Sequence, residues 1–232
     1  MIALSPNVDL KRDANILLIG AHSDDIEIGC GGTILRMVRE LERVNIRWVV
    51  FSSEESRFEE ARKSAGEFLA GIPSANVRVD VLDQRNAYFP DCFREIKDYF
   101  EQLKSEISPD MIFTHQKEDL HQDHRVLADL TWNTFRSHLI LEYEIPKYDG
   151  GLRDPNLFMP LAKDVCERKI EILFKHFESQ RSKHWFTRDL FLGLMRVRGL
   201  EGGIPGGFAE AFYCRKSIWS WSSQTARPTP EA

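Results

Sequence analysis

Short apolar segments alternate four times with longer amphipathic segments in the first 136 residues of this 232-residue chain. The apolar segments are rich in Ile, Leu, Val and Phe, which is typical of strands buried on both faces of a sheet. The longer segments carry apolar residues every three or four positions, which predicts helices with one face on a core. We therefore expect an α/β fold with right-handed crossovers and a mainly parallel sheet covered by helices on both faces. The expected strands are 16–19, 46–51, 77–82 and 111–114, and the expected helices are 33–41, 56–69, 93–107 and a fourth that begins near His121.

The pattern changes after Arg136. Residues 138–145 predict another strand, and residues 166–177 predict another helix. Residues 147–160 are rich in Gly, Pro, Asp and Asn and predict a long loop, which is a candidate for the rim of a substrate site. Five glycines and one proline between 199 and 207 predict a flexible or tightly turning segment, and 208–213 predict a strand that returns toward the site. The polar, proline-containing segment 222–232 predicts a disordered tail.

Length and composition favour one domain, residues 1–221, followed by that tail, because 42% hydrophobic residues suffice for a core. The net charge of −5 and a pI near 5.8 argue against a nucleic-acid-binding protein, which usually has a basic face. No apolar run approaches the roughly 18–20 residues that a membrane span needs. The four cysteines are scattered, which predicts reduced thiols and a cytoplasmic location. Whether the chain forms a homo-oligomer stays open, and Trp219 and Trp221 could either dock the tail or serve a subunit contact.

Two clusters of polar residues follow expected strands. His22-Ser23-Asp24-Asp25 comes after the first strand, and His121-Gln122-Asp123-His124 comes after the fourth. Because ligands of parallel sheets bind beyond the carboxyl ends of the strands, we expect both clusters at the same edge. Together they predict one composite site with a divalent metal and a general base.

A catalytic zinc usually takes three protein ligands from His and carboxylate and keeps one position open for water. His22, Asp25 and His124 would supply these ligands. Asp24 would point away from its neighbour and is the candidate general base for a zinc-activated water. His121, as an imidazolium, would stabilise the oxyanion or protonate the leaving nitrogen, and Asp123 would hold the tautomer of His121 or raise its pKa.

The sequence resembles the PIG-L/LmbE-type deacetylases in both clusters. Residues 22–33 (HSDDIEIGCGGT) are similar to the opening motif of that family, and residues 119–125 (DLHQDHR) are similar to its second motif. Residues 179–180 and 209–212 (AEAF) add a weaker similarity. Two positions differ: Ser23 stands where the family usually has Pro, and the acidic residue that follows the Asp pair lies one place later, at Glu27.

The resemblance implies a Rossmann-like three-layer fold and zinc-dependent removal of an N-acetyl group, typically from an N-acetylglucosamine moiety. It also implies His22, Asp25 and His124 as zinc ligands, Asp24 as the base, and His121 with Asp123 as the charge-stabilising pair. Fe²⁺ would suit the same ligands. The expected partner is a soluble amino-sugar substrate.

Several residues keep two interpretations. Arg57, His115 and Glu210 are candidates for substrate binding, but a surface arginine, a buried histidine and a solvated strand residue are the alternatives. Asp119 is expected to cap a helix or to support a ligand rather than to bind metal. Two other functions also stay open: a related zinc hydrolase that cleaves another acyl amide or C–N bond, and a non-catalytic sugar- or metal-binding module.

Overall fold

A computed structural model describes residues 13–41, 43–53 and 55–218. The tail predicted at 222–232 and the two tryptophans at 219 and 221 lie outside the described residues, so those predictions stay untested. The division into one domain, residues 1–221, also stays a prediction.

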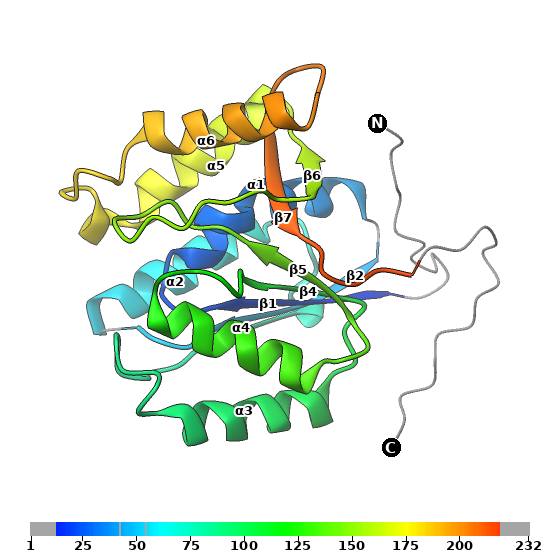
Figure 1. Ribbon diagram of the computed structural model, residues 1–232, viewed down its shortest axis with the longest axis vertical. Helices are drawn as coiled ribbons and strands as arrows, with labels where there is room; N and C mark the ends of the chain where they lie inside the picture. The colour runs from blue at the N-terminus through cyan, green and yellow to red at the C-terminus, as the bar shows by residue number, and fades with distance from the viewer. Residues whose placement is uncertain (1–12, 42, 54, 219–232) are drawn as a thin grey trace.

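A seven-stranded sheet runs through the molecule in the order β3-β2-β1-β4-β5-β7-β6 (Figure 1). The first five strands of this order are parallel to one another, whereas β7 is antiparallel to both β5 and β6. This mostly parallel, Rossmann-like sheet is the predicted one. The strands are β1 (Ala14–Gly20), β2 (Val44–Val50), β3 (Val77–Val81), β4 (Met111–His115), β5 (Leu139–Tyr143), β6 (Leu157–Pro160) and β7 (Ala209–Tyr213).

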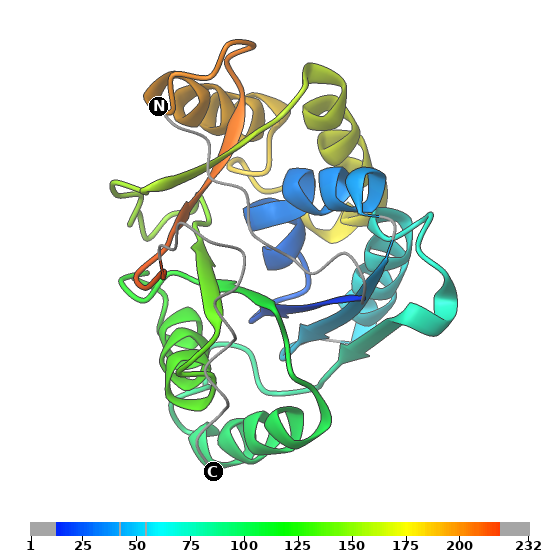
Figure 2. The ribbon, with the colours of Figure 1, turned by 90° about the vertical axis from the view of Figure 1, so that its right-hand side faces the viewer.

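Helices cover both faces of the sheet, as predicted (Figures 1 and 2). On one face, Leu17 and Ile19 of β1 pack against apolar residues of α3 and α4, including Phe100 and Leu127. On the other face, Trp48 belongs to a larger core with α1, α2, α5 and α6. The helices are α1 (Asp25–Glu40), α2 (Glu55–Phe68), α3 (Phe93–Glu106), α4 (Gln122–Thr134), α5 (Lys163–His176) and α6 (Arg188–Glu201), with short 3₁₀ turns at Ser74–Asn76 and Glu178–Gln180.

Helix α1 begins at Asp25, eight residues before the predicted start at Thr33. The glycine-rich run therefore lies inside the helix and not in a turn before it. The helix is interrupted at Cys30, whose φ of −142° and ψ of 17° are not helical. The boundary was mispredicted because residues 25–35 are all buried, so this half of the helix lacks the contrast between an apolar and a polar face from which a helix start is predicted.

Two elements of the C-terminal third are absent from the sequence predictions. Strand β6 lies at the end of the predicted loop 147–160 and pairs with β7. Helix α6 precedes the glycine-rich segment, and its exposed Val197 and Leu200 blur the apolar stripe. The predicted tight turning after it is present, since Gly203, Gly206 and Gly207 all have positive φ.

Candidate active site

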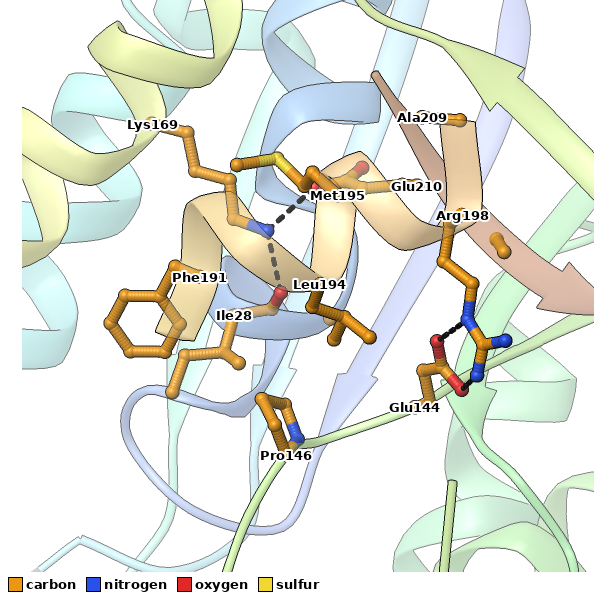
Figure 3. A pocket seen from close by; sticks show the side chains of 12 residues that line it. Ile28, Glu144, Pro146, Lys169, Phe191, Leu194, Met195, Arg198, Ala209 and Glu210 are labelled. Carbon is orange, nitrogen blue, oxygen red and sulfur yellow. Dashed lines mark hydrogen bonds and ion pairs between the residues drawn. The ribbon is translucent and has the colours of Figure 1, made fainter. Parts of the chain in front are cut away.

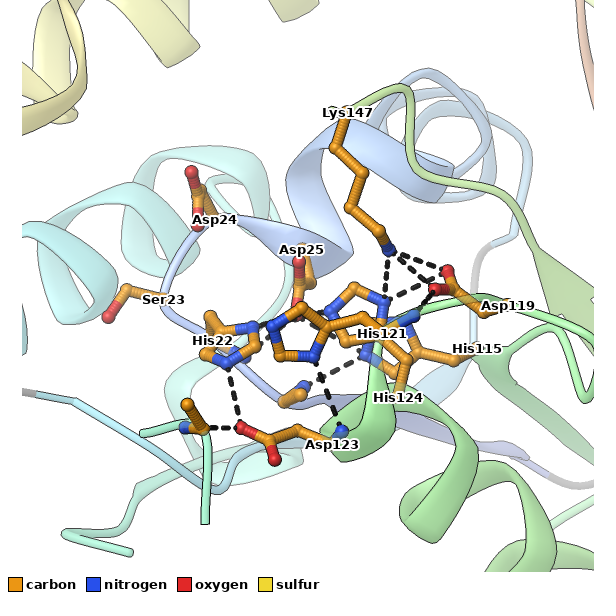
Figure 4. A network of polar contacts seen from close by, with 12 residues as sticks. His22, Ser23, Asp24, Asp25, His115, Asp119, His121, Asp123, His124 and Lys147 are labelled. Carbon is orange, nitrogen blue, oxygen red and sulfur yellow. Dashed lines mark hydrogen bonds and ion pairs between the residues drawn. The ribbon is translucent and has the colours of Figure 1, made fainter. Parts of the chain in front are cut away.

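Two imidazoles and one carboxylate meet at the carboxyl edge of the sheet (Figure 4). His22 and Asp25 follow β1, and His124 lies in the first turn of α4, after β4. Because β1 and β4 are parallel neighbours, both segments emerge at the same edge. His22 Nδ1 lies 3.2 Å from Asp25 Oδ2 and 3.2 Å from His124 Nε2, and His124 Nε2 lies 3.4 Å from Asp25 Oδ2.

This donor set fits a divalent cation. Zinc–ligand bonds of about 2.0–2.1 Å in tetrahedral geometry place the ligand atoms about 3.3 Å apart. The three atoms have that spacing, and the side chain of His22 is 12% exposed against 2% for His124, so the group opens to solvent beside His22. Two other sets of ligand atoms lie within 4.8 Å of one another: His22, His121 and His124, and Asp25, His115 and His124.

In each of the two imidazoles, the ring nitrogen that faces away from the cluster contacts a carboxylate. Asp119 Oδ2 lies 3.0 Å from His124 Nδ1, which leaves His124 Nε2 to present its lone pair to the cluster. Asp123 Oδ2 lies 3.3 Å from His22 Nε2 and also accepts a hydrogen bond from Ala87 N at 2.7 Å. Asp119 therefore supports a candidate ligand and does not join the cluster, in line with the sequence-based expectation.

The charge on His22 depends on the same neighbours. Burial lowers the pKa of His22, but Asp25 and the hydrogen bond to Asp123 outweigh burial and raise it to about 9. The ring is therefore protonated at neutral pH when no cation is bound. A cation that binds Nδ1 must displace that charge, so metal binding would release a proton.

Lys147 binds the carboxylate that supports His124 and is not among the sequence predictions. Its Nζ donates to both oxygens of Asp119 at 2.7 Å; it also lies 2.8 Å from His124 Nδ1, which cannot accept from it while Nδ1 donates to Asp119. Burial raises the pKa of the Asp119 carboxyl, but the hydrogen bond to His124 and the charge of Lys147 hold it well below its usual range. Asp119 therefore stays ionised between two donors.

Asp24 and Asp25 point to different partners, as expected for successive residues. Whereas Asp25 faces the imidazoles, Asp24 Oδ1 accepts a hydrogen bond from Arg57 Nη2 at 2.7 Å. Asp24 is buried, with 5% of its surface exposed, and Arg57 binds only one of its two carboxylate oxygens. Arg57 thus lies in the site, where it contacts the candidate base.

His121 lies beside the cluster, but its ring is not oriented by the carboxylate of Asp123. The Asp123 oxygens accept from Ala87 N and Phe89 N and contact His22, whereas only the backbone N of Asp123 approaches His121 Nδ1, at 3.3 Å. Burial and the neighbouring His124 and His22 lower the pKa of His121 to about 4. This shift favours a neutral ring over the expected imidazolium, and the bond from Asp123 N to Nδ1 places the proton of a neutral ring on Nε2.

His115 lies behind the cluster. It is fully buried, its ring stacks on His124 with centroids 3.7 Å apart, and its Nε2 accepts from Ala21 N at 3.0 Å. Burial and His124 lower its pKa to about 3, so the ring is neutral. This position gives no support to the expectation that His115 binds substrate.

Glu210 has other partners as well. Its carboxylate accepts from Gly32 N, from Thr33 N and from Lys169 Nζ, all within 2.7 Å. The side chain is buried against the far end of the glycine run, and these bonds occupy both oxygens. The expectation that Glu210 contacts substrate therefore gains no support from the geometry.

Comparison with known proteins places both polar clusters inside one family domain. The family described as PIG-L: GlcNAc-PI de-N-acetylase matches residues 17–135, which is half of the chain. The chain belongs to the PIG-L family. The match ends before Lys147, Lys169 and Glu210.

Individual relatives agree with this assignment. Over 176 residues the chain is 28% identical to the uncharacterized deacetylase YaiS of Escherichia coli (strain K12), covering 72% of this chain and 92% of that protein. The solved N,N′-diacetylchitobiose deacetylase of Pyrococcus horikoshii has a TM-score of 0.61 at 19% identity and covers 88% of this chain and 84% of its own.

The same fold also occurs in a protein with another reaction. GalB, the 4-carboxy-2-hydroxymuconate hydratase of Pseudomonas putida KT2440, has a TM-score of 0.67 at 14% identity and covers 90% of this chain and 99% of its own. Structural likeness at this identity shows the fold alone. The family assignment therefore depends on the matched sequence of residues 17–135.

Two departures from the PIG-L motif have clear positions in the structure. Ser23 is buried and its hydroxyl lies 3.2 Å from Ser53 Oγ, so a polar contact to the segment after β2 replaces the usual proline. Glu27 is fully buried in α1, and burial raises its pKa well above the usual range. In the described part of this PIG-L protein, no helix has both the length and the apolar character needed to cross a membrane.

Proposed function

We propose that this protein is a metal-dependent N-deacetylase that removes the acetyl group from an amino-sugar-containing small molecule. The observation that carries the proposal is the convergence of His22 Nδ1, Asp25 Oδ2 and His124 Nε2 within 3.4 Å of one another, beside the buried Asp24. Membership of the PIG-L family supports the type of reaction, and the diacetylchitobiose deacetylase of Pyrococcus horikoshii, which has the same fold, supports an acetylated sugar as substrate.

His22, Asp25 and His124 would hold the cation, and we propose zinc, with Fe²⁺ as the alternative. A bound zinc ion supplies Lewis acidity, which lowers the pKa of water and polarises an acyl oxygen. Asp119 and Asp123 keep the two imidazoles in the tautomers that present a lone pair inward.

We assign Asp24 as the general base. Its carboxylate lies next to a candidate ligand in the chain and is held by Arg57, which fixes one oxygen and leaves the other to accept a proton from water. Arg57 is charged and only partly exposed, so the same guanidinium is also a candidate for contact with a substrate hydroxyl or phosphate.

His121 would act as a neutral hydrogen-bond donor. With Nδ1 accepting from the backbone of Asp123, its Nε2–H is available to the acyl oxygen as negative charge develops there. Asp123 would assist this reaction indirectly, because its carboxylate holds His22 and the loop at 87–89.

The four cysteines of the described residues are free thiols, which supports the cytoplasmic location that we also propose.

The test of the function is acetate release from N-acetylglucosamine, N,N′-diacetylchitobiose and an N-acetylglucosaminyl conjugate. We expect release that is lost with a chelator and restored by zinc. A zinc-loaded protein that binds these sugars without turnover would instead be a binding module, and turnover of only a different amide would favour the related hydrolase.

A further inference from the structure

The break in helix α1 leaves backbone groups without partners inside the helix. At Cys30 the ladder of helical hydrogen bonds is interrupted, so the preceding turn ends with free carbonyls and the next turn starts with free N–H groups. These groups lie inside the protein, since Ile28, Gly31 and Gly32 are all buried. Buried backbone groups of this kind need partners from elsewhere in the chain.

One buried ion pair supplies those partners (Figure 3). Lys169 of α5 donates to Ile28 O at 2.6 Å, and Glu210 of β7 accepts from Gly32 N at 2.7 Å and from Thr33 N at 2.6 Å. Lys169 Nζ and Glu210 Oε1 also lie 2.7 Å apart, and the two side chains are only 3% and 4% exposed. The pair therefore caps both ends of the break, the cation on the carbonyl side and the anion on the N–H side.

The short segment before the break carries the site. It runs from Asp25 to Gly29, directly after Asp24, and a helix of five residues does not hold its own conformation. Its far end is fixed by the bond from Lys169 and by Gly29, whose added Cβ would lie 2.2 Å from the ring of Tyr143. The Asp25 carboxylate also accepts a hydrogen bond from His22 N at 2.7 Å, so its direction depends on that bond and on where the contacts at Ile28 and Gly29 hold the turn.

We propose that Lys169 and Glu210 are positioning residues. They set the angle of the first turn of α1 and so place the carboxylates of Asp25 and Asp24 correctly beside His22 and His124. This inference rests on the proposed function, because it takes Asp25 as a ligand of the cation. It assigns Glu210 a role without substrate contact. The pair comes from the C-terminal third of the chain, outside the matched family domain.

Stability alone does not account for such a pair. Desolvation offsets most of the attraction within a buried ion pair, so the intact pair stabilises the fold little compared with apolar residues, although removing one partner is destabilising because the other charge stays buried and unpaired. A second buried pair nearby provides the comparison: Glu144 accepts two bonds from Arg198, at 2.7 and 2.8 Å, and lines the same cavity (Figure 3). The other hydrogen bonds of that pair among the described residues are with Glu201, Arg153 and Tyr213, and not with α1.

The experiment compares Glu210→Gln, which removes charge at constant size, with the control Glu144→Gln. Each purified full-length protein is titrated with Co²⁺, whose visible absorption reports ligand number and geometry, and with Zn²⁺ against a chelator. Both titrations are made well below the thermal midpoint of each variant. Thr33→Val, which removes one 2.6 Å bond to Glu210, is the milder variant if Glu210→Gln does not fold.

We expect Glu210→Gln to weaken metal binding by about 10-fold or more and to shift the Co²⁺ bands, with Thr33→Val giving a smaller change in the same direction. Glu144→Gln should lower the thermal midpoint but leave affinity and bands unchanged. Wild-type affinity and bands in both Glu210→Gln and Thr33→Val would overturn the inference, as would equal weakening in the control. A wild-type protein that takes up no Co²⁺ or Zn²⁺ would instead overturn the proposed function.

Discussion

The acidic residues of the site differ in what each one touches. Asp25 faces the imidazoles, Asp24 contacts Arg57, Asp119 contacts His124, and Asp123 contacts His22. We therefore propose separable effects for these four carboxylates: one on the cation, one on proton transfer and two on the orientation of ligands. Single substitutions can tell these effects apart.

Asp24→Asn tests proton transfer. The amide keeps the bond from Arg57 but cannot accept a proton, so we expect turnover to fall by about 10²- to 10⁴-fold while zinc content stays at the wild-type level. Steady-state acetate release and elemental analysis measure the two quantities. Arg153→Gln, which removes an exposed ion pair with Glu118, is the control. Activity of Asp24→Asn within tenfold of wild type would exclude Asp24 as the base.

Asp119→Asn tests the support of His124. Loss of the negative charge weakens the acceptor that fixes the Nδ1–H tautomer, so we expect zinc affinity to fall by about 10- to 100-fold and activity to recover at high zinc concentration. Chelator competition measures the affinity. Unchanged affinity would mean that the contact with His124 does not matter for the metal.

Sequence motifs identify the residues that meet here but not their orientation. The spacing of His22, Asp25 and His124 predicted a shared site, and their atoms do converge. The partner of Asp123 could not be predicted, because His22 and His121 are both within reach and only the angle of the first turn of α4 decides between them. Lys147 gave no signal, since it lies in a segment without periodicity.

The glycines near the start of helix α1 are packed closely against neighbouring elements. A Cβ on Gly29 would lie 2.2 Å from Tyr143, and a Cβ on Gly31 would lie 2.8 Å from Phe68. These contacts bring the helix against β5 and α2, which is why the sequence there lacks the usual apolar stripe. The start of α1 was for this reason mispredicted, whereas the amphipathic α3 was predicted to within one residue.

Gly29→Ala tests this packing. We expect a loss of about 1–3 kcal/mol in the free energy of unfolding, because the methyl group must displace the Tyr143 ring. Urea unfolding measures the change. Gly193→Ala in α6 is the matched control: no atom lies within 4 Å of its added Cβ, and alanine favours helix, so this variant should be neutral or more stable. Equal stability of the two variants would contradict the packing argument.

Helices α2 and α5 are joined by Glu67, which accepts from Arg168 and Lys175 and contacts His176. Burial raises the pKa of Glu67, but these three partners outweigh burial and lower it from 4.5 to about 2. Because the folded-state pKa lies below the unfolded one, the stabilisation is complete above pH 4.5 and is lost as the pH falls from 4.5 to 2.

Glu67→Gln should therefore cost about 1–2 kcal/mol at pH 7, after allowance for solvent screening of the exposed partners. The difference from wild type should shrink between pH 4.5 and 2. Unfolding by urea at a series of pH values measures it, with Glu167→Gln, an exposed residue of α5, as the control. A difference that does not vary with pH would show that the charge of Glu67 is not what joins the helices.

In the whole molecule, residues beyond the matched family region contact the segments that carry the site. Residues 17–135 hold both polar clusters, whereas Lys147 binds Asp119, and Lys169 and Glu210 bind the backbone of α1. Alternation of strands and helices was enough to predict the parallel part of the sheet. The sequence also predicted a strand at 208–213, which is β7, but neither β6 nor the antiparallel pairing was predicted, because that pairing joins segments some fifty residues apart.

The central claim is that residues from β1 and α4 share one cation. Crystals of the zinc-loaded protein, measured at the zinc absorption edge, test it most directly through the anomalous signal. We predict one peak, about 2.0–2.2 Å from His22 Nδ1, Asp25 Oδ2 and His124 Nε2. A peak ligated by other residues, or a zinc-loaded protein without a peak at this position, would contradict the account.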